Sequence, residues 1–527
     1  MFPVRFLSFF LLLTLGVAQI SRSQSNSLKS VANIYNVLDF GAKGDGRTLN
    51  TKSIQLAVDA AAKTSGTILI PNGNFLSGTI FLRSNVRLEL TGGSVLMASP
   101  SMKDYIRHNW GPSDNRTPWH LLVADKAKNI SISGTGTING DGSRFWKKER
   151  ANAWVNYEVN GDRPCPLLEF SQCENVLMEN VTIANSPGWT SHFISSKNLT
   201  IRNLTISNSL FAPDGDGLIL TGCSDVNISD CRIATSESAI AVRTTANSGP
   251  SERIAIRNCI LETMGIALQV GYESRQAIRD VMMSGIVVKN CSRILDIRSA
   301  EGGILERIHL SEVSGQTNSG KPANRIIEID LNELPDLTRI KNKNHPDFGK
   351  MIPLTGKGAI RDVSITDVDV QTDGRIMMAA ADGMMLENIF LDNIHLRYTM
   401  IDNSLALSKR SDTIADYFKG SMDLRTAPAA VAVKNINGFS LDHFRISWPV
   451  FPVPDSWNLL KSDNRFLEPG WYKDNESRIK SGELKPTFKA FWGKNVKGGL
   501  LELSTVRASE PGIGKTECTG CSLTIRE

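Results

Sequence analysis

Residues 198–209 read NLTIRNLTISNS, two short runs of alternating apolar and polar residues that meet at Asn203. Alternation with a period of two is typical of a β-strand with one buried face, and asparagine between two such runs is typical of a tight turn. The stretch therefore predicts two short strands joined by a single polar residue, with one face of each strand pointing into a core.

The same pattern recurs along most of the chain, at spacings of about 20 to 50 residues, which is the period of repeat architectures. Its copies are NISISGTGTI (129–138), NVLMENVTIANS (175–186), DVNISDCRIATS (225–236), RIAIRNCIL (253–261), IRDVMMSGIVV (278–288), LERIHLSEV (305–313), IRDVSITDVDV (360–370), MLENIFLDNIHL (385–396) and VKNINGFSLDHFRI (433–446). Helical patterns are nearly absent between them, which excludes βαβ units, and a β-sandwich or propeller would repeat by whole hairpins or blades. The repeats favour an all-β fold, a right-handed parallel β-helix with coils ~4.8 Å apart.

Length and composition agree with one large repeat domain. The chain has 527 residues, of which 41% are hydrophobic, so it is neither disordered nor short of a core. The net charge of +5 comes from 59 basic and 54 acidic residues, and no dense basic run exists, which argues against a nucleic-acid partner. We expect residues 25–527 to form a single monomeric β-helix domain, with 447–527 as a C-terminal extension and the last coils.

The first residues resemble a secretory signal peptide. Arg5 precedes an apolar run over 6–18, and polar residues follow it. The run is too short to cross a membrane, which needs about 20 apolar residues. We predict a signal peptide over 1–24 and a secreted or periplasmic protein without a transmembrane segment; a buried N-terminal strand is the alternative.

A solenoid needs a cap at its end, and residues 50–63 supply a candidate. Ile54, Val58 and Ala61 fall on one helical face, and Asn50 or Thr51 is placed to cap the helix. Three stretches that break the repeat, 101–125, 331–358 and 397–430, are predicted as long loops.

The eight cysteines are few for an exported chain of this length. Cys231, Cys259 and Cys291 follow similar polar pairs, which suggests buried thiols stacked at one repeated position. Cys518 and Cys521 are three residues apart without the further ligands that zinc needs, so a local disulfide or a plain turn is expected there.

Three acids are placed where the repeat would bring them together. Asp214 and Asp216 are two residues apart, which puts them on the same side of a strand, and Glu237 follows 21 residues after Asp216, about one coil later. Two carboxyl groups in one cleft are the requirement for hydrolysing a glycosidic bond. The alternative is a glycine-rich turn at 214–217 with a solvated Glu237; a calcium loop is not supported, because the EF-hand pattern is not met.

Four further stretches carry a family resemblance: YNVLDFGAKGDGRTLNTKSIQLAVDAA (35–61), GNFLSGTIFLRSNVRLEL (73–90), GTINGDGSRFW (136–146) and NSPGWTSHFISSKNLTI (185–201). Together they resemble glycoside hydrolase family 28, the polygalacturonase-type enzymes. The resemblance implies a right-handed parallel β-helix and inverting hydrolysis of α-linkages in pectic polysaccharides. It also implies that no metal or organic cofactor takes part.

The family's two acidic motifs survive unevenly in this chain. Its Asn-Thr-Asp-Gly is matched by residues 214–217, which makes Asp216 the essential aspartate and places Asp214 where the family has asparagine. Its Gly-Asp-Asp is matched by residues 236–238, so Glu237 takes the place of the acid and Ser238 replaces the second aspartate. We predict Asp216, Glu237 and Asp214 as catalytic residues, with Asp214 as a substitute for the carboxylate lost at Ser238.

The two motifs that bind substrate in the family are altered more strongly. Its Gly-His-Gly falls on residues 265–267, where the histidine is absent, and its Arg-Ile-Lys falls on 296–298, where Asp296 replaces a cation and Arg298 keeps one. Carboxylates need such cationic partners. The resemblance therefore favours a rhamnogalacturonan-type or modified galacturonan over plain homogalacturonan.

Five residues are candidates for substrate binding, each with a structural alternative. Arg298 lies at the family's cation position but could form an ion pair within the protein, and Arg243 comes just after the expected strand of Glu237. Gln269 and Tyr272 follow the lost histidine, where a surface turn explains them nearly as well. His192 lies in a family landmark, where a hydrogen-bonded structural histidine is the alternative.

The sequence thus predicts an exported glycoside hydrolase of an acidic plant-type polysaccharide or oligosaccharide, exo-acting because of its long loops. A non-catalytic glycan-binding β-helix is the main alternative, suggested by the altered motifs. A polysaccharide lyase on the same fold ranks lower, since lyases use an arginine or lysine base with Ca²⁺ and no such pattern is present.

Overall fold

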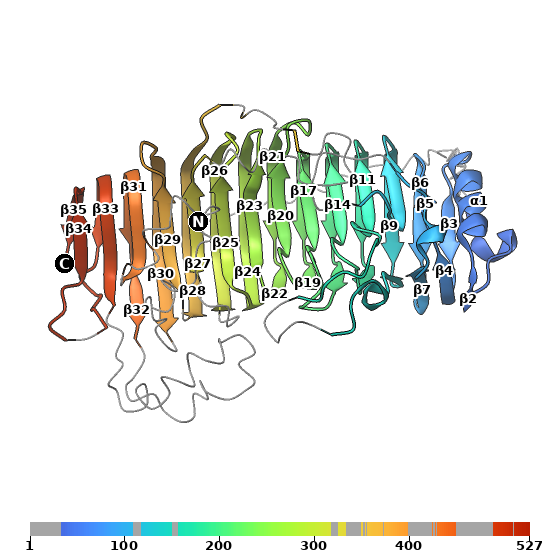
Figure 1. The fold of residues 1–527 in the computed structure, drawn as a ribbon, viewed down its shortest axis with the longest axis horizontal. Coiled ribbons are helices and arrows are strands. Elements are labelled where there is room, and N and C mark those ends of the chain that lie inside the picture. Colours follow the sequence, from blue (N-terminus) through green and yellow to red (C-terminus); the bar gives the residue numbers. More distant parts are fainter. Residues whose placement is uncertain are drawn as a thin grey trace, which may run out of the picture. The chain divides into compact units, whose positions relative to one another are not determined.

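The structure is a computed structural model that describes residues 33–108, 117–149, 156–317, 325–333, 349–350, 354, 356–372, 374–398, 424, 427, 429–448, 488–509 and 511–527. Residues Asn33–Glu527 form one compact unit. The fold is the right-handed parallel β-helix that the repeats predict: the described strands pair in parallel from coil to coil, from β1 to β35 (Figure 1). The predicted signal peptide lies outside the described residues.

Three parallel ladders run along the solenoid, and the first one carries the residues of the site. Its strands are β5 (Ile80–Phe81), β8 (Leu122–Asp125), β11 (Leu168–Ser171), β14 (Ser191–Ile194), β17 (Leu218–Thr221), β20 (Ile240–Thr244), β23 (Ile266–Ser274), β25 (Arg293–Ser299), β27 (Arg325–Leu331), β29 (Arg375–Ala380), β31 (Ala429–Asp442), β33 (Lys489–Glu502) and β34 (Thr516–Thr519). The later halves of β31 and β33 continue into the second ladder, so one long strand serves two ladders there.

The second ladder carries the longest strands. They are β1 (Ile34–Asn36), β3 (Thr67–Ile70), β6 (Val86–Leu90), β9 (Lys128–Gly134), β12 (Glu174–Glu179), β15 (Lys197–Arg202), β18 (Ser224–Ser229), β21 (Ser251–Arg257), β24 (Ile278–Asn290), β26 (Ile304–Thr317), β28 (Ala359–Thr372), β30 (Leu386–Tyr398) and β35 (Ser522–Arg526).

The third ladder closes each coil. It contains β2 (Asp45–Leu49), β4 (Gly73–Ser77), β7 (Ser94–Ala98), β10 (Thr137–Asn139), β13 (Thr182–Ala184), β16 (Thr205–Ser207), β19 (Arg232–Thr235), β22 (Ile260–Thr263) and β32 (Arg445–Ser447). The later part of β24 pairs with β22, so a single strand runs from the second ladder into the third in β24, β26, β28 and β30.

Apolar side chains occupy the same register position in successive coils and form the core. One such row consists of Val176, Leu199, Val226, Ile254, Val281, Ile308, Val363, Ile389 and Phe439, all of them buried. A shift of register by one residue would turn every side chain of a strand to the other face. The alternation in the sequence therefore fixes the register of the coils as well as the strands.

Polar residues in the left-handed backbone region mark the turns. Asn203, which the sequence predicts as the link between two strands, joins β15 to β16 with φ 52°. A second row, which we call the outer turn row, consists of Asn129, Asn175, Asn198, Asp225, Arg253, Asp280, Arg307, Asp362 and Asn388, with φ between 52° and 59°. Asparagine and aspartate tolerate this conformation better than most residues, which explains why they punctuate the repeat.

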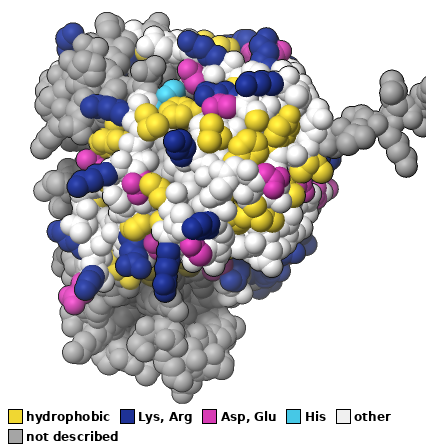
Figure 2. All heavy atoms as spheres, turned by 90° about the vertical axis from the view of Figure 1, so that its right-hand side faces the viewer, with side chains coloured by type: hydrophobic (Ala, Val, Ile, Leu, Met, Phe, Trp, Pro, Cys, Tyr) yellow, Lys and Arg dark blue, Asp and Glu magenta, His cyan; other side chains and the backbone are white. Residues whose placement is uncertain are grey.

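Helix α1 (Thr51–Ala62) covers the N-terminal end of the core, as predicted. Ile54, Ala57, Val58 and Ala61 are fully buried on its inner face. The outer side of this end retains exposed leucines on α1, η1 (Val37–Phe40) and β2, and Figure 2 shows apolar side chains interspersed with charged ones on this face. The other short helices are η2 (Met102–Asp104) and η3 (Gly142–Phe145).

The cysteines behave as predicted with one exception. Cys231 and Cys259 are buried at matching positions of neighbouring coils, before the paired residues Arg232 and Ile260. The prediction of a three-membered stack is wrong, because Ile286 occupies that position in the next coil and Cys291 lies after the end of β24. A disulfide joins Cys518 to Cys521, which confirms the local pairing.

The predicted loops are only partly described. Within 101–125, residues 109–116 lie outside the described residues, and 122–125 form β8 rather than a loop. Most of 331–358 and 397–430, and the extension 449–487, lie outside the described residues. None of the helices among the described residues has both the length and the hydropathy of a membrane span.

Candidate active site

The turn that precedes β17 carries two of the three predicted acids. Asp214 has left-handed backbone geometry (φ 48°), and its Oδ2 accepts a hydrogen bond of 2.7 Å from Arg163 Nη2. The expectation that Asp214 and Asp216 share one face of a strand is wrong, because β17 begins at Leu218. Asp214, with its side chain 49% exposed, pairs with an arginine that is 7% exposed.

Asp216 is held on both of its carboxylate oxygens. Its Oδ1 accepts a hydrogen bond of 2.7 Å from the backbone N–H of Ser238, and its Oδ2 accepts one of 2.7 Å from Arg243 Nη2. The side chain is 5% exposed. Both donors come from the next coil, and hydrogen bonds to an ionised carboxylate are among the stronger ones in proteins. The arrangement fixes the carboxylate in one orientation.

Glu237 lies on the coil next to Asp216, as the spacing predicts. Its backbone N–H donates to Gly215 O at 3.1 Å, and Gly217 N–H donates to Ser238 O at 2.8 Å. The two acids are therefore offset by one residue across neighbouring coils, whose backbones lie ~4.8 Å apart. Asn156 Nδ2 donates to Glu237 Oε1 at 2.7 Å. Glu237 is half-buried, unlike the buried Asp216.

Three glycines allow the coils to approach closely at this point. A Cβ on Gly215 would lie 2.3 Å from Ser236 Oγ, one on Gly217 would lie 2.4 Å from Ala239 O, and one on Gly265 would lie 2.8 Å from Glu237 O. Each contact is shorter than real Cβ contacts allow. The glycines of the acidic motif thus let Asp216 and Glu237 share one small region.

Arg243 lies beside the carboxylate of Asp216 and is 8% exposed. Its Nη2 also donates to Gln269 Oε1 at 2.9 Å, and Gln269 Oε1 accepts a second hydrogen bond from Ser238 Oγ at 2.9 Å. The guanidinium lies over the ring of Trp189, 5.1 Å from its centroid. Burial disfavours its charge, but the nearby charges of Asp216 and Glu273 outweigh this and raise the pKa of Arg243. The group is therefore a permanent cation in a buried setting.

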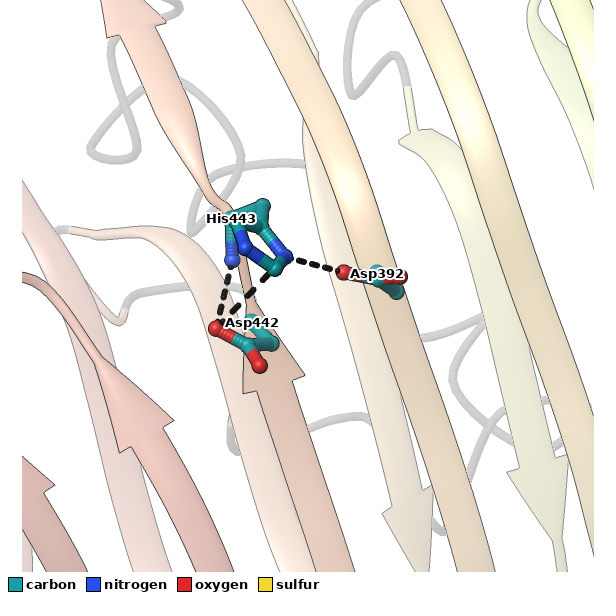
Figure 3. Close-up of side chains that lie close together, drawn as sticks. All are labelled: Asp392, Asp442 and His443. Carbon is teal, nitrogen blue, oxygen red and sulfur yellow. Dashed lines mark hydrogen bonds and ion pairs between the residues drawn. The ribbon is translucent and has the colours of Figure 1, made fainter.

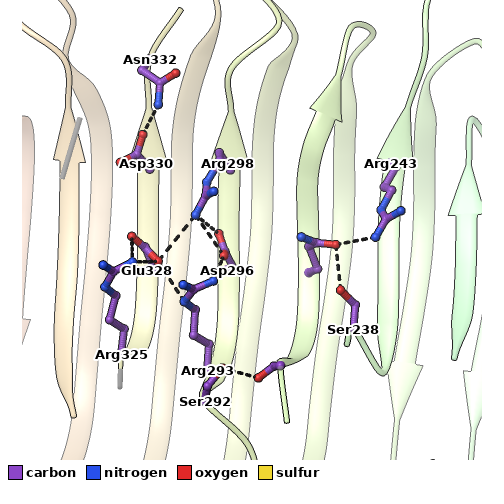
Figure 4. A network of polar contacts seen from close by, with 12 residues as sticks. Ser238, Arg243, Ser292, Arg293, Asp296, Arg298, Arg325, Glu328, Asp330 and Asn332 are labelled. Atoms are coloured by element: carbon purple, nitrogen blue, oxygen red, sulfur yellow. Dashed lines mark hydrogen bonds and ion pairs between the residues drawn. The ribbon is translucent and has the colours of Figure 1, made fainter. Parts of the chain in front are cut away.

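A buried ion network continues along the first ladder toward its C-terminal end (Figure 4). Gln269, Asp296 and Glu328 occupy one register row on β23, β25 and β27. Arg298 Nη2 donates to Asp296 Oδ2 at 3.1 Å and lies 3.6 Å from Glu328 Oε2. Arg325 Nη1 donates to both oxygens of Glu328 at 2.6 Å. Arg298 thus pairs with carboxylates of the protein.

The neighbouring charges in this network shift the pKa values of Glu328 and Arg298. Burial alone would raise the pKa of Glu328, but Arg325, Arg293 and Arg298 together hold it well below its usual range. Burial works against the charge of Arg298, while Asp296 and Glu328 raise its pKa above the ordinary value. Both groups are therefore charged across the physiological range, and each neutralises the other.

The remaining candidates lie in the wall of the same region. His192 is buried, its Nε2 lies 2.9 Å from Thr221 Oγ1, and its ring meets that of Trp189 edge-on at 5.3 Å. Tyr272 has φ 77°, and Arg298 lies over its ring at 5.5 Å. The alternative of a surface turn for Gln269 and Tyr272 is wrong, because both belong to strand β23.

Two residues of the site were missed by sequence reasoning. Asn156 precedes its partner Glu237 by 81 residues, and Arg163 precedes Asp214 by 51. Neither lies in a repeat or beside a quoted motif. Their contacts follow from how the segment after residue 155 returns to the first ladder, which no local pattern encodes.

One other group of side chains has the composition of a metal site. Asp392 lies within β30, Asp442 ends β31 and His443 follows it, and the potential ligand atoms of the three residues lie within 4.8 Å of one another (Figure 3). His443 Nδ1 lies 2.8 Å from Asp392 Oδ1, and this hydrogen bond together with the charge of Asp442 raises the pKa of the imidazole. Because His443 is 72% exposed and pairs with both acids, an exposed ion-pair cluster explains the group.

Comparison with known proteins identifies the family of the chain. The model of a family described as glycosyl hydrolases family 28 matches residues 61–404, more than half of the chain. A probable polygalacturonase of Vitis vinifera is 28% identical over 308 residues, which are 54% of this chain and 61% of that protein. An exo-poly-alpha-D-galacturonosidase of Dickeya chrysanthemi is 28% identical over 263 residues, 42% of this chain and 43% of that protein.

A solved structure extends the likeness of the fold. The family 28 exopolygalacturonase of Yersinia enterocolitica superimposes with a TM-score of 0.61 at 19% identity, covering 79% of this chain and 75% of that chain. At this identity the superposition supports the fold alone. The chain spans 61% and 43% of the length of the two curated relatives described above.

Proposed function

We propose, since the chain belongs to glycosyl hydrolases family 28, that it hydrolyses α-glycosidic bonds in a pectic or related acidic polysaccharide. The observation that supports this most directly is the pair of acids on neighbouring coils, one buried and clamped by a cation, the other half-buried and contacted by a neutral amide. Two carboxyl groups in different environments are what separate acid and base roles in such enzymes.

In the proposed reaction Asp216 is the general base. Its carboxylate accepts a proton from a water molecule while the oxygen of that water forms a bond to the anomeric carbon. The hydrogen bonds from Ser238 N–H and Arg243 Nη2 hold the two carboxylate oxygens in one orientation, and a base must be positioned in this way. Attack by water on the face opposite the leaving group inverts the anomeric configuration.

Glu237 is the proposed general acid. It gives its proton to the glycosidic oxygen as the bond between that oxygen and the anomeric carbon breaks, so the leaving sugar departs as an alcohol. Solvent then returns the proton from Asp216 to Glu237, and the net change is the addition of one water. Asn156 Nδ2 donates a hydrogen bond to Glu237 Oε1, and this amide brings no formal charge to the side chain.

We propose that Asp214 compensates the positive charge of the buried Arg163, and that it does not replace the second carboxylate, which is missing at Ser238. Its Oδ2 accepts a hydrogen bond from the buried Arg163, and its backbone lies in a turn.

We also infer that plain homogalacturonan is not the preferred substrate. Arg298 is paired with Asp296 and Glu328, so a sugar carboxylate would have to compete with both of these carboxylates. A rhamnogalacturonan-type or modified galacturonan fits better.

The test is hydrolysis of defined pectic oligosaccharides by the full chain. We expect Asp216→Asn and Glu237→Gln each to lower turnover by at least ~10²-fold, the contribution of one general acid or base. Asp225→Asn is the matched control, because Asp225 also pairs with an arginine of the next coil but lies in the outer turn row. The control should keep full activity.

The products distinguish the proposed inverting hydrolase from a lyase and from a non-catalytic glycan-binding protein. NMR of the fresh product should show the inverted anomer, and a retained anomer would contradict the proposed mechanism. Products with an unsaturated uronate, detected by ultraviolet absorbance, would indicate a lyase. Binding of the glycans without release of any product would indicate a non-catalytic glycan-binding protein.

We also infer that the protein is exported, on the basis of the signal-like residues 1–24. Expression of the full chain with its own N-terminus should release a product that begins after this segment, which N-terminal sequencing of the secreted protein would identify. An uncleaved N-terminus in the cell fraction would contradict export.

A further inference from the structure

We propose that Arg243 is a positioning residue of this reaction: its guanidinium, in place of a second carboxylate, fixes the orientation of the base Asp216. The inference rests on the proposed function and goes beyond it, because it assigns a role that the family motifs do not provide.

The geometry places Arg243 against the base from the next coil. Its Nη2 donates to Asp216 Oδ2 at 2.7 Å, and the two side chains are 9% and 5% exposed. A buried carboxylate is costly unless a charged partner and hydrogen bonds compensate it. In this protein Arg243 supplies the charge, and the Ser238 N–H supplies the hydrogen bond to the other oxygen.

The guanidinium is itself held in place by three contacts. The ring of Trp189 lies beneath it at 5.1 Å, Gln269 Oε1 accepts from Nη2 at 2.9 Å, and Glu273 Oε2 lies 3.9 Å from Nη1. Gln269 is fixed in turn by Ser238 Oγ at 2.9 Å. Since both terminal nitrogens of Arg243 face protein groups and the residue is 8% exposed, the arrangement suits a support for Asp216 better than a ligand for a sugar carboxylate.

Ser238 changes the charges that surround Asp216. The family resemblance assigns a second carboxylate to this position, and two neighbouring carboxylates influence each other's charge strongly. In this chain the side chain of Ser238 is neutral and is directed to Gln269. The charged group that contacts Asp216 from the next coil is therefore the cation Arg243.

The experiment compares kcat and KM of the wild type with those of Arg243→Gln, Arg243→Lys and Arg243→Ala on one pectic oligosaccharide that the wild type cleaves. A positioning role predicts that Arg243→Gln lowers kcat about 10²-fold, as loss of one preorganised charge does, with KM changed less than about threefold. Arg243→Lys should recover part of kcat, because it keeps the cation. Added guanidinium should raise kcat of Arg243→Ala several-fold.

Arg375→Gln is the matched control. Arg375 is also buried, lies over the ring of Phe488 at 5.9 Å and donates to Ala427 O at 2.6 Å, but it has no contact with the acids. We expect it to lower the melting temperature while kcat stays unchanged. A merely structural role of Arg243 would give the same result as this control.

The outcomes separate this inference from the proposed function. If the wild type releases product but Arg243→Gln raises KM at unchanged kcat, Arg243 is a substrate ligand and the inference is wrong. If Arg243→Gln fails to fold, the test is to compare kcat of Arg243→Lys with kcat of Arg243→Ala measured without added guanidinium. A higher kcat for Arg243→Lys supports the inference, and equal values would overturn it. If the wild type cleaves no pectic glycan, the proposed function fails and the inference falls with it.

Discussion

Two ion pairs of the same kind lie in different parts of the molecule. Arg243 pairs with Asp216 across neighbouring coils at 2.7 Å, and Arg253 pairs with Asp225 across neighbouring coils at 2.7 Å. The first pair is 9% and 5% exposed and adjoins the first ladder; the second is 51% and 42% exposed and lies in the outer turn row. Distance and topology are nearly the same, so burial is the difference between them.

This difference decides what each pair contributes. Exposed pairs are screened by water and salt and are worth about 0.2–1 kcal/mol. Removing one partner of a buried pair costs about 3–5 kcal/mol, because a buried charge is left without compensation. The pairs in the outer turn row therefore add little to stability, while the pairs along the first ladder compensate charged groups that would otherwise be costly to bury.

The largest effect on stability is expected from a substitution of Glu328. This residue forms ion pairs with Arg325, Arg298 and Arg293. Glu328→Gln should lower the free energy of unfolding by about 3–5 kcal/mol, because it removes the negative charge of a buried network. Urea unfolding followed by circular dichroism measures this. A loss below 1 kcal/mol would show that the network is no more costly to break than the outer pairs.

The same residue should make stability depend on acid pH. The three arginines hold the pKa of Glu328 below its ordinary value of 4.5. A group whose pKa is lowered by folding stabilises the protein above its unfolded pKa, and this stabilisation is lost as pH falls toward the folded pKa. We expect the wild type to lose stability on acidification below about pH 4.5, and Glu328→Gln to lose less over the same range. Parallel slopes for the two proteins would argue against this assignment.

A smaller effect is expected in the outer turn row. Asp225→Asn should lower the free energy of unfolding by about 0.2–1 kcal/mol, since the pair with Arg253 is exposed. The effect should shrink further in 1 M salt, where the Debye length is about 3 Å. Thermal unfolding at low and high salt measures both points, and a salt-independent loss would mean that burial does not separate the two pairs.

The smallest effect is expected at His443. Its pKa is raised by the hydrogen bond to Asp392 and the charge of Asp442, so its contribution is present below the ordinary histidine pKa of 6.5 and is lost as pH rises through the folded value. His443→Gln should flatten the dependence of the melting temperature on pH above 6.5. A difference that appears only below this pH would contradict the sign.

The fold could be predicted from the sequence because the same pattern of two short strands and a polar turn recurs in many coils. Alternation fixed the inward rows, and the polar punctuation fixed the turns, as Asn203 illustrates. The stack of three cysteines failed because β24 merges two ladders into one strand at that coil, which moves Cys291 out of register. A spacing in sequence does not reveal such a merger.

The site was predictable only in part, for a physical reason. The neighbouring positions of Asp216 and Glu237 follow from the coil length, which local pattern does encode. The partners of the acids do not: Asn156 and Arg163 reach them from a distant segment, and Arg298 faces Asp296 and Glu328 instead of solvent. Contacts between side chains on different coils depend on the tertiary structure, which local sequence patterns do not encode.

The two acids belong to separate coils, and this has a consequence for how the protein can change. The rise between coils, ~4.8 Å, is set by backbone hydrogen bonds and is the same for any sequence that keeps the solenoid. Substitutions within a coil can replace one side chain by another but cannot alter the spacing between the two backbones. The positions of the groups on Asp216 and Glu237 can therefore change only through the length of their side chains and through the turns and segments that leave the wall.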